Sequence, residues 1–422
     1  MITTFALVGC GRGGGADGHA ASSASTPPSA SAPAPPGSAT VPASVSATVS
    51  ARPSAVPDEP PAGTAPPASF TGAKAEKACH AQTVEVATYQ TRGEIALAGQ
   101  GDAVAAAWRV RLAGKRQEQI AFASFDKEGH PLARPRGVGD TTHDVPPRLL
   151  GTGSAFAVIW FDDKGLAFAR ARTDPLPPPE IAHVGSVGPD VAADVAIALW
   201  PAGGGIAAAP FGDGSQLGLF VFAPDDGSAV KAMGVTHHAK KPHRPAIAAS
   251  AAGTFVAWDD GGALMASRFD AAGKEGASAC TIAPATATPR ERFALVPTAG
   301  GAVAMWMEGP KVRTRALDAS ACPASPIWTV GEGKWATMAA LGDTPLVAWV
   351  DGGGRLLSVR LAASGAPAAR GIDASEGTSG VKDPPAVVTF GGRAAFGWAE
   401  VMSPAISTKR LNVRIVDATC VP

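Results

Sequence analysis

The chain has 422 residues, and 45% of them are hydrophobic, so it is long and apolar enough to bury a large core. Its 50 glycines and 38 prolines argue against long helices. The 36 basic and 36 acidic residues balance, so no field over the whole protein draws it to nucleic acid or to an anionic membrane. We therefore expect a turn-rich protein with no nucleic-acid partner.

The first ten residues end in Leu7-Val8-Gly9-Cys10, which resembles the lipobox of bacterial lipoproteins. The resemblance implies that Cys10 is acylated and becomes the mature N-terminus. The apolar run before Cys10 is short and contains no Lys or Arg, so residues 1–10 form a truncated signal segment. Either the genuine start lies upstream, or the match is accidental and Cys10 is an ordinary cysteine. With the lipid as the only membrane contact, we expect a location in the cell envelope, as an outer-membrane lipoprotein or otherwise outside the cytoplasm.

Residues 11–74 are rich in Pro, Ala and Ser. Between His19 and Ser69 the only formal charges are Arg52, Asp58 and Glu59, and no aromatic residue occurs. Such a segment cannot bury enough apolar surface to offset the entropy lost on ordering. The sequence therefore predicts a disordered linker behind the anchor.

A short apolar strand that ends in Trp recurs through residues 75–422. The marker ends at Trp108, Trp160, Trp258, Trp306, Trp349 and Trp398, and Pro210 stands in the slot of the third copy. Successive slots are 43 to 52 residues apart. The regular spacing indicates an internal repeat in which each Trp packs between neighbouring units.

The same order of elements surrounds each marker. A strand and a Gly turn precede it, and a Gly/Asp turn and a strand of alternating apolar and polar residues follow it, as in 411–416. Most copies then reach an Asp that we interpret as a turn residue bonded to its own backbone rather than a calcium ligand. These are Asp126, Asp174, Asp225, Asp270, Asp318 and Asp417.

This pattern resembles the β-propeller superfamily over residues 75–422, without the Gly-His and Trp-Asp dipeptides of WD-type repeats. The resemblance implies an all-β fold, a propeller of about seven four-stranded blades preceded by the disordered segment.

The last copy has no fourth strand of its own, so we expect residues 79–88 to supply it and to close the ring. Cys79 and Cys420 would then lie close enough for a disulfide. Cys280 and Cys322 occupy what we interpret as corresponding places in consecutive copies. Because outer strands of neighbouring blades diverge, we expect these two to exceed the limit of about 7 Å between Cα atoms that a bridge allows.

No catalytic, phosphate-binding or metal-binding motif is present, and we predict no cofactor. The most suggestive segment is His237-His-Ala-Lys-Lys-Pro-His-Arg244, which precedes the first strand of the fourth copy. In propellers, this fourth-to-first-strand connection lies on a face that commonly binds ligands. The predicted ligand-binding residues are His143, Asp144, His237, His238, Lys240, Lys241, His243 and Arg244.

The equivalent connections of other copies also carry charge, which implies a mixed-charge ring on that face. Its members are Arg92, Glu94, Asp190, Asp194, Arg290, Glu291, Arg292, Glu332, Lys334, Lys382 and Asp383. Two alternatives stay open: a solvated loop surface with no ligand, and a metal site at His237, His238 and His243, which the neighbouring lysines oppose.

Two functions remain in competition. The leading hypothesis is a monomeric, non-catalytic, surface-tethered lipoprotein that presents a propeller face to a protein or an acidic glycan. The alternative is a hydrolase or lyase that acts on polysaccharides, and it is disfavoured by a single tyrosine, Tyr89, and by the few acidic residues at predicted inner positions. Fold alone does not decide between them.

Overall fold

The computed structural model describes residues 69–72, 81–89, 91–111, 118–153, 155–171, 181–184, 194–199, 204–211, 216–223, 231–235, 242–251, 253–276, 278–378, 380–403 and 408–422. Within them the chain forms seven β-sheets and one short 3-10 helix, η1 (Ala418–Cys420). None of the helices in this part of the chain has the length and apolarity to span a membrane.

Sheets 1 to 3 follow one another in the chain, each with its strands in sequence order. Sheet 1 contains β3 (Thr91–Gln100), β4 (Ala103–Arg111), β5 (Glu118–Asp126) and β6 (Pro131–Thr141). Sheet 2 contains β7 (Arg148–Gly151), β8 (Phe156–Asp162), β9 (Gly165–Ala171) and β10 (Ile181–Val184). Sheet 3 contains β11 (Ala196–Leu199), β12 (Gly205–Phe211), β13 (Gln216–Phe222) and β14 (Lys231–Val235).

Sheets 4 to 6 continue the pattern. Sheet 4 contains β15 (Pro242–Ser250), β16 (Gly253–Asp260), β17 (Ala263–Phe269) and β18 (Cys280–Ala283). Sheet 5 contains β19 (Arg290–Thr298), β20 (Gly301–Glu308), β21 (Lys311–Leu317) and β22 (Trp328–Glu332). Sheet 6 contains β23 (Lys334–Leu341), β24 (Thr344–Val350), β25 (Leu356–Arg360), β26 (Arg370–Asp373) and, outside them, β1 (Ser69–Gly72).

Sheet 7 joins the two ends of the domain. It contains β27 (Ala386–Phe390), β28 (Arg393–Ser403), β29 (Thr408–Asp417) and, as its fourth strand, β2 (Ala81–Tyr89). β2 runs antiparallel to β29, with Ala81 opposite Val416 and Val84 opposite Val413. The predicted closure is confirmed for residues 81–88, because β2 completes the last sheet, while residues 79 and 80 lie outside the described part of the chain.

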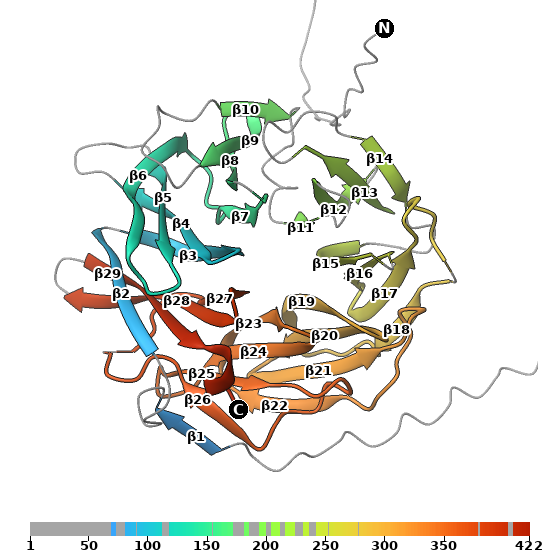
Figure 1. Cartoon of the computed structure of the whole chain (residues 1–422). Helices are drawn as coiled ribbons and strands as arrows, with labels where there is room; N and C mark the ends of the chain where they lie inside the picture. The colour runs from blue at the N-terminus through green and yellow to red at the C-terminus, as the bar shows by residue number, and fades with distance from the viewer. Residues whose placement is uncertain are drawn as a thin grey trace, which may run out of the picture. The chain divides into compact units, whose positions relative to one another are not determined.

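The seven sheets stand around a common centre. The first strand of each sheet contacts the first strand of the next, and β27 contacts β3, so the ring is closed. Figure 1 shows β3, β7, β11, β15, β19, β23 and β27 nearest the centre. The predicted all-β propeller of seven blades is confirmed.

β1 falls inside the segment that the sequence interpretation assigned to a disordered linker. It pairs in parallel with β26, Ser69 opposite Arg370, and Phe70 packs edge-on against Trp349 with 5.5 Å between ring centroids. These four residues therefore belong to sheet 6. The remaining parts of 11–74, with Cys10, lie outside the described residues.

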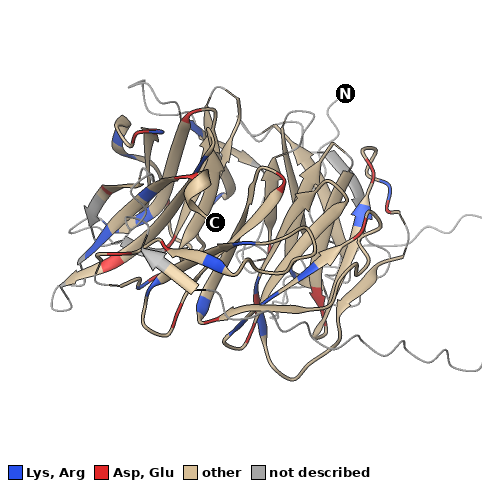
Figure 2. Ribbon diagram, turned by 60° about the horizontal axis from the view of Figure 1, so that its bottom comes forward, with Lys and Arg blue, Asp and Glu red and all other residues tan. Residues whose placement is uncertain are grey.

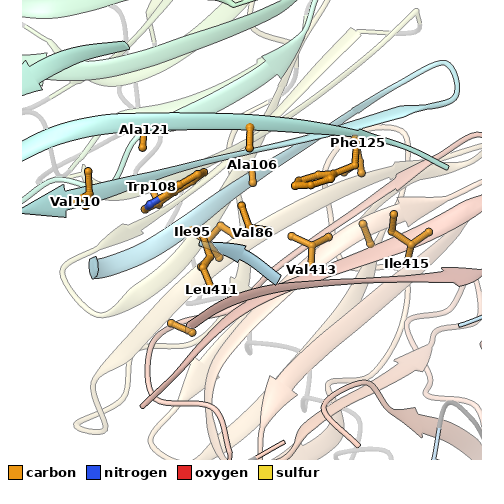
Figure 3. Close-up of a cluster of buried hydrophobic side chains, with 14 of the residues drawn as sticks. Val86, Ile95, Ala106, Trp108, Val110, Ala121, Phe125, Leu411, Val413 and Ile415 are labelled. Atoms are coloured by element: carbon orange, nitrogen blue, oxygen red, sulfur yellow. The ribbon is translucent and has the colours of Figure 1, made fainter. Parts of the chain in front are cut away.

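Hydrophobic clusters fill the spaces between neighbouring sheets, and the Trp residues of the repeat sit in six of them. Trp108 lies with Ile95 and Val413 between sheets 7 and 1 (Figure 3). The other five occupy the equivalent place between the sheet that carries each Trp and the preceding sheet. All six side chains are buried, which confirms the structural interpretation of the marker.

Among the described residues of the seventh space, between sheets 2 and 3, none is a Trp, because Pro210 occupies that slot in β12. Phe168 and Phe222 fill it instead, with 5.3 Å between their ring centroids. The repeat therefore tolerates the substitution because aromatic volume arrives from other strands.

The Asp residues of the repeat make turns. Oδ1 of Asp126 accepts the amides of Glu128 and His130, Oδ1 of Asp270 those of Ala272 and Lys274, and Oδ1 of Asp318 those of Ser320 and Cys322. Asp417 forms an ion pair with Arg393. The turn interpretation is confirmed for these three residues, while Asp174 and Asp225 lie outside the described part of the chain.

Cys280 and Cys322 form a disulfide, with their Cα atoms 5.1 Å apart, so the expectation that they lie too far apart was wrong. The two places do not correspond: Cys322 is four residues after Asp318, whereas Cys280 is ten residues after Asp270. The turn after β21 lies against β18, and Arg315 donates to the carbonyl of Ile282 across the same gap. The bridge therefore ties sheet 5 to sheet 4.

Cys420 is buried and is also disulfide-bonded. Its predicted partner, Cys79, lies outside the described residues, so this pairing stays a prediction. The ladder supports it, because Ala81, two residues after Cys79, lies opposite Val416, four residues before Cys420.

Candidate functional site

A β-bulge interrupts the first strand in sheets 1, 4, 5 and 6. The pairing register shifts between Arg92 and Ala96, between His243 and Ala246, between Glu291 and Ala294, and between Lys334 and Thr337. The bulges lie near the start of each strand, on the face that carries the connections from a fourth strand to the next first strand. We call this the connection face. A bulge turns side chains out of the regular alternation and is frequent beside functional sites.

Four residues occupy the same place at these bulges. In each of these sheets, one residue of the first strand pairs with the residue just before the Trp. The residue two positions before that first-strand residue is Glu94, Arg244, Arg292 or Trp335. The last three have left-handed backbones, with φ of 50°, 57° and 56°. Non-glycine residues rarely adopt that region, at a cost of about 1–3 kcal/mol each. Three of the four places carry a charge.

Arg292 forms an ion pair with Glu94. The two residues belong to sheets 5 and 1, which are not neighbours in the ring, so the pair spans the centre. Both side chains keep partial access to solvent. The centre of the connection face is therefore polar and holds two opposite charges in contact.

Arg148, the first residue of β7, interacts electrostatically with both members of that pair. Burial lowers the pKa of its guanidinium, Glu94 raises it and Arg292 lowers it again. Part of its surface remains exposed, and its Nη1 donates to the carbonyl of Pro146 (3.5 Å). Arg stays protonated in proteins, so the shift marks a charge held where water solvates it poorly.

Arg244 continues the polar centre through sheets 3 to 5. Its amide donates to Oδ1 of Asp194 (2.8 Å), and its guanidinium donates to the carbonyl of Arg290 (2.6 Å). We call Glu94, Arg148, Asp194, Arg244 and Arg292 the central cluster; three positive and two negative charges leave it with a net charge of +1. Elsewhere Lys and Arg positions are intermixed with Asp and Glu positions (Figure 2).

His143 and Asp144 lie in the connection from sheet 1 to sheet 2. Nε2 of His143 is 3.1 Å from the carbonyl of Asp162, and Asp144 forms an ion pair with Arg109 while its own side chain is 92% exposed. Asp144 is exposed, whereas His143 is half-buried. Among the described contacts, none joins them to the central cluster.

His243 and Arg244 lie at the start of β15. Nε2 of His243 is 3.8 Å from Oδ1 of Asp259, and Arg244 belongs to the central cluster. His237, His238, Lys240 and Lys241 lie outside the described residues. Of the predicted residues that the structure describes, His143, Asp144, His243 and Arg244, only Arg244 belongs to the central cluster.

Sequence reasoning did not single out Arg148, Glu94 and Arg292 as binding residues. Glu94 and Arg292 were included only in a charged ring, and Arg148 was missed. Aligning the repeats on the Trp slot would have placed Glu94, Arg244 and Arg292 together. Arg148 has no such signal, because its role follows from the convergence of β7 on the residues of non-neighbouring sheets.

The central cluster suits the binding of anions. Guanidinium groups donate in a fixed, planar arrangement to carboxylate or phosphate, and a poorly solvated guanidinium gains more from an anion than one in water. Across the described ranges, no group of three or more His, Cys, Asp or Glu side chains is arranged to hold a metal ion.

No protein-family model and no curated protein matches this chain. Among solved structures it is similar to the WD40 domain of coronin from Toxoplasma gondii, with a TM-score of 0.48 and 9% identity over 80% of this chain and 86% of that one. It is also similar to the polysaccharide lyase Uly1, with a TM-score of 0.48 and 8% identity over 76% of this chain and 89% of that one. It is also similar to the SapL1 lectin in complex with alpha methyl fucoside, with a TM-score of 0.43 and 11% identity over 65% of this chain and 95% of that one. At such values the likenesses carry no function across, and the strand pairing of this chain alone establishes its fold.

Proposed function

We propose that the seven-sheet domain is a non-catalytic binding module, and that its connection face recognises an anionic group on a protein or an acidic glycan. The central cluster would contact that group, and the charged connections around it, including His143 and His243, would form the rim.

One observation carries the proposal: Arg292 of sheet 5 and Glu94 of sheet 1 form an ion pair across the centre of the ring, and half-buried Arg148 lies near both. Burying a guanidinium without full compensation is costly, so the site gains free energy when an anion arrives. Glu94 and Asp194 offset only two of the three arginines of the cluster.

The test is an array of acidic and neutral glycans probed with the full chain, together with capture of partner proteins that have acidic surfaces. We expect binding to acidic ligands that Arg148→Gln weakens about 10- to 100-fold, the loss for one hydrogen bond to a charged group. Arg134→Gln, at an exposed position on the outer strand β6, is the matched control and should bind as the wild type does. Turnover of a bound glycan would instead favour the hydrolase or lyase alternative.

We propose further that the domain is tethered to the cell envelope through a lipid on Cys10 and the linker behind it. Support comes from the lipobox resemblance and the Pro/Ala/Ser-rich composition, both features of the sequence. With the genuine start of translation, Cys10→Ser should move the protein from the membrane fraction to the soluble fraction. Retention of that variant in the membrane fraction would remove the anchor.

A further inference from the structure

A cavity of about 450 Å³ opens between sheets 6 and 7, away from the central cluster. Its walls come from β2, β28, β29 and the turn that follows β26. The residues that matter below are Thr83, Glu376, Glu400, Arg410, Asn412 and Arg414. A volume of this size is within the range of about 300–1,000 Å³ typical of small-molecule sites.

β29 divides its side chains between two surfaces. Leu411, Val413 and Ile415 pack into the cluster between sheets 7 and 1. Because side chains alternate along a strand, Arg410, Asn412 and Arg414 lie on the opposite surface, toward sheet 6. One strand thus supplies a core and a polar cavity wall.

Asn412 is the only asparagine in the chain, and it stands at a place where the fold does not require a polar residue. It pairs with Trp398, and the residues that pair with the other slots are Ala121, Ala167, Leu217, Met265, Arg313 and Leu357. Five of those six are apolar. Asn412 is 3% exposed, and its Nδ2 has no hydrogen-bond partner.

Two hydrogen bonds hold the guanidinium of Arg414, and one of its nitrogens has no hydrogen-bond partner. Its Nε donates to Oγ1 of Thr83 and its Nη2 to the carbonyl of Glu376, both at 2.8 Å, while Nη1 is buried without a partner. The residue is 2% exposed, and burial lowers the pKa of its guanidinium, with Glu376 and Asp373 opposing. A buried donor without a hydrogen bond costs about 1–3 kcal/mol, so several such donors in one cavity need an explanation.

The carboxylates near the cavity already have partners. Arg410 forms ion pairs with Glu85 (3.4 Å) and Glu400 (3.5 Å). Three nitrogens of the lining residues have no hydrogen-bond partner, Nε of Arg410, Nδ2 of Asn412 and Nη1 of Arg414, and all three are donors, so a ligand has to bring acceptor oxygens. A carboxylate supplies two, in the planar arrangement that a guanidinium and an amide match.

We propose that this cavity binds a small carboxylate ligand through Asn412 and Arg414. Half-exposed Met402 at the rim provides apolar contact for the body of the ligand, and Glu400 accepts from any hydroxyl that it carries. Both a uronic acid and a simple aliphatic carboxylate have this chemistry.

The test is calorimetric titration of the full chain with galacturonate, its neutral counterpart galactose, and propionate. We expect galacturonate to bind and galactose to bind at least about tenfold more weakly, the difference of one charge-assisted hydrogen bond. Propionate equal to galacturonate would identify the simple carboxylate as the ligand. Absence of binding by both carboxylates, or equal binding of galactose, would overturn the proposal.

Asn412→Leu separates a binding role from a structural one. It copies the residue of sheet 6, Leu357, and removes an unpartnered buried donor, so the melting temperature should stay the same or rise while carboxylate binding falls at least about tenfold. A lower melting temperature, or failure to fold, would show that Asn412 serves the fold and would contradict the proposal. Arg148→Gln, which tests the central cluster, should leave this titration unchanged, so the two sites succeed or fail separately.

Discussion

At the scale of the residue, the buried Trp side chains carry the contacts between sheets. Trp306 is fully buried among the side chains of sheets 4 and 5. Trp306→Ala should therefore lower the free energy of unfolding by about 3–5 kcal/mol, the range for truncating a buried Trp. Urea denaturation measures it. Trp328→Ala is the control, because half-buried Trp328 lies on the outer strand β22, and an equal loss in both variants would refute the assigned role.

The turn aspartates give the fold a dependence on acid. Burial raises the pKa of Asp351, but hydrogen bonds from the amide and guanidinium of Arg355 lower it more, so the net pKa lies below the ordinary value. Asp126 behaves alike, with burial opposed by the amide and ring of His130. The folded state thus binds fewer protons than the unfolded chain, and this stabilisation is present above about pH 4 and lost as pH falls further.

Asp351→Asn should accordingly be less stable than the wild type at pH 7 and should lose less stability between pH 7 and pH values below about 4. Urea midpoints across that range measure the effect. Asp343→Asn is the matched control at an exposed turn and should follow the wild type. If Asp351→Asn lost as much stability as the wild type on acidification, the hydrogen bonds to Arg355 would not stabilise the fold.

At the scale of the element, the sequence revealed what is local and periodic. The Trp slots and the alternating third strands repeat at a regular spacing, so they predict seven sheets. The last copy lacks a fourth strand of its own, and this gap predicts closure by β2. The place of Pro210 was visible for the same reason. β1 was missed because a four-residue strand beside a Pro-rich segment has no period.

The elements that contact each other across sheets were harder to predict. The bridge between Cys280 and Cys322 depends on how far the turn after β21 reaches toward β18, and no spacing in the sequence encodes that reach. The central cluster depends on the convergence of first strands from sheets 1, 2, 4 and 5. Long-range contacts of this kind are fixed by packing, and a single sequence shows only their members.

The closing strand leads to a prediction about the remaining cysteines. Cys420 is disulfide-bonded, and β2 approaches it along the ladder with β29. Peptide mapping without reduction, on protein made in an oxidising compartment, should find Cys280 linked to Cys322 and Cys420 linked to Cys79. Free thiols at Cys79 would contradict the second link, while the first tests the described geometry by itself.

At the scale of the whole molecule, balance of charge is the feature that gives the central cluster its significance. The chain has equal numbers of basic and acidic residues, so no general field attracts an anion. Any preference for acidic partners has to come from a local arrangement, and the three arginines on the connection face provide one. The cavity between sheets 6 and 7 is a second, separate arrangement of donors.

The salt dependence of binding tests this account most directly. The dissociation constant of an acidic ligand selected on the array is measured at several salt concentrations for the wild type, Arg148→Gln and Arg134→Gln. Charges that keep access to solvent are screened beyond about 10 Å at 0.1 M salt, so wild-type affinity should fall as salt rises. We predict that Arg148→Gln binds more weakly and that its affinity changes less with salt, while Arg134→Gln behaves as the wild type does. Wild-type affinity and slope in Arg148→Gln would show that the central cluster does not bind the anion.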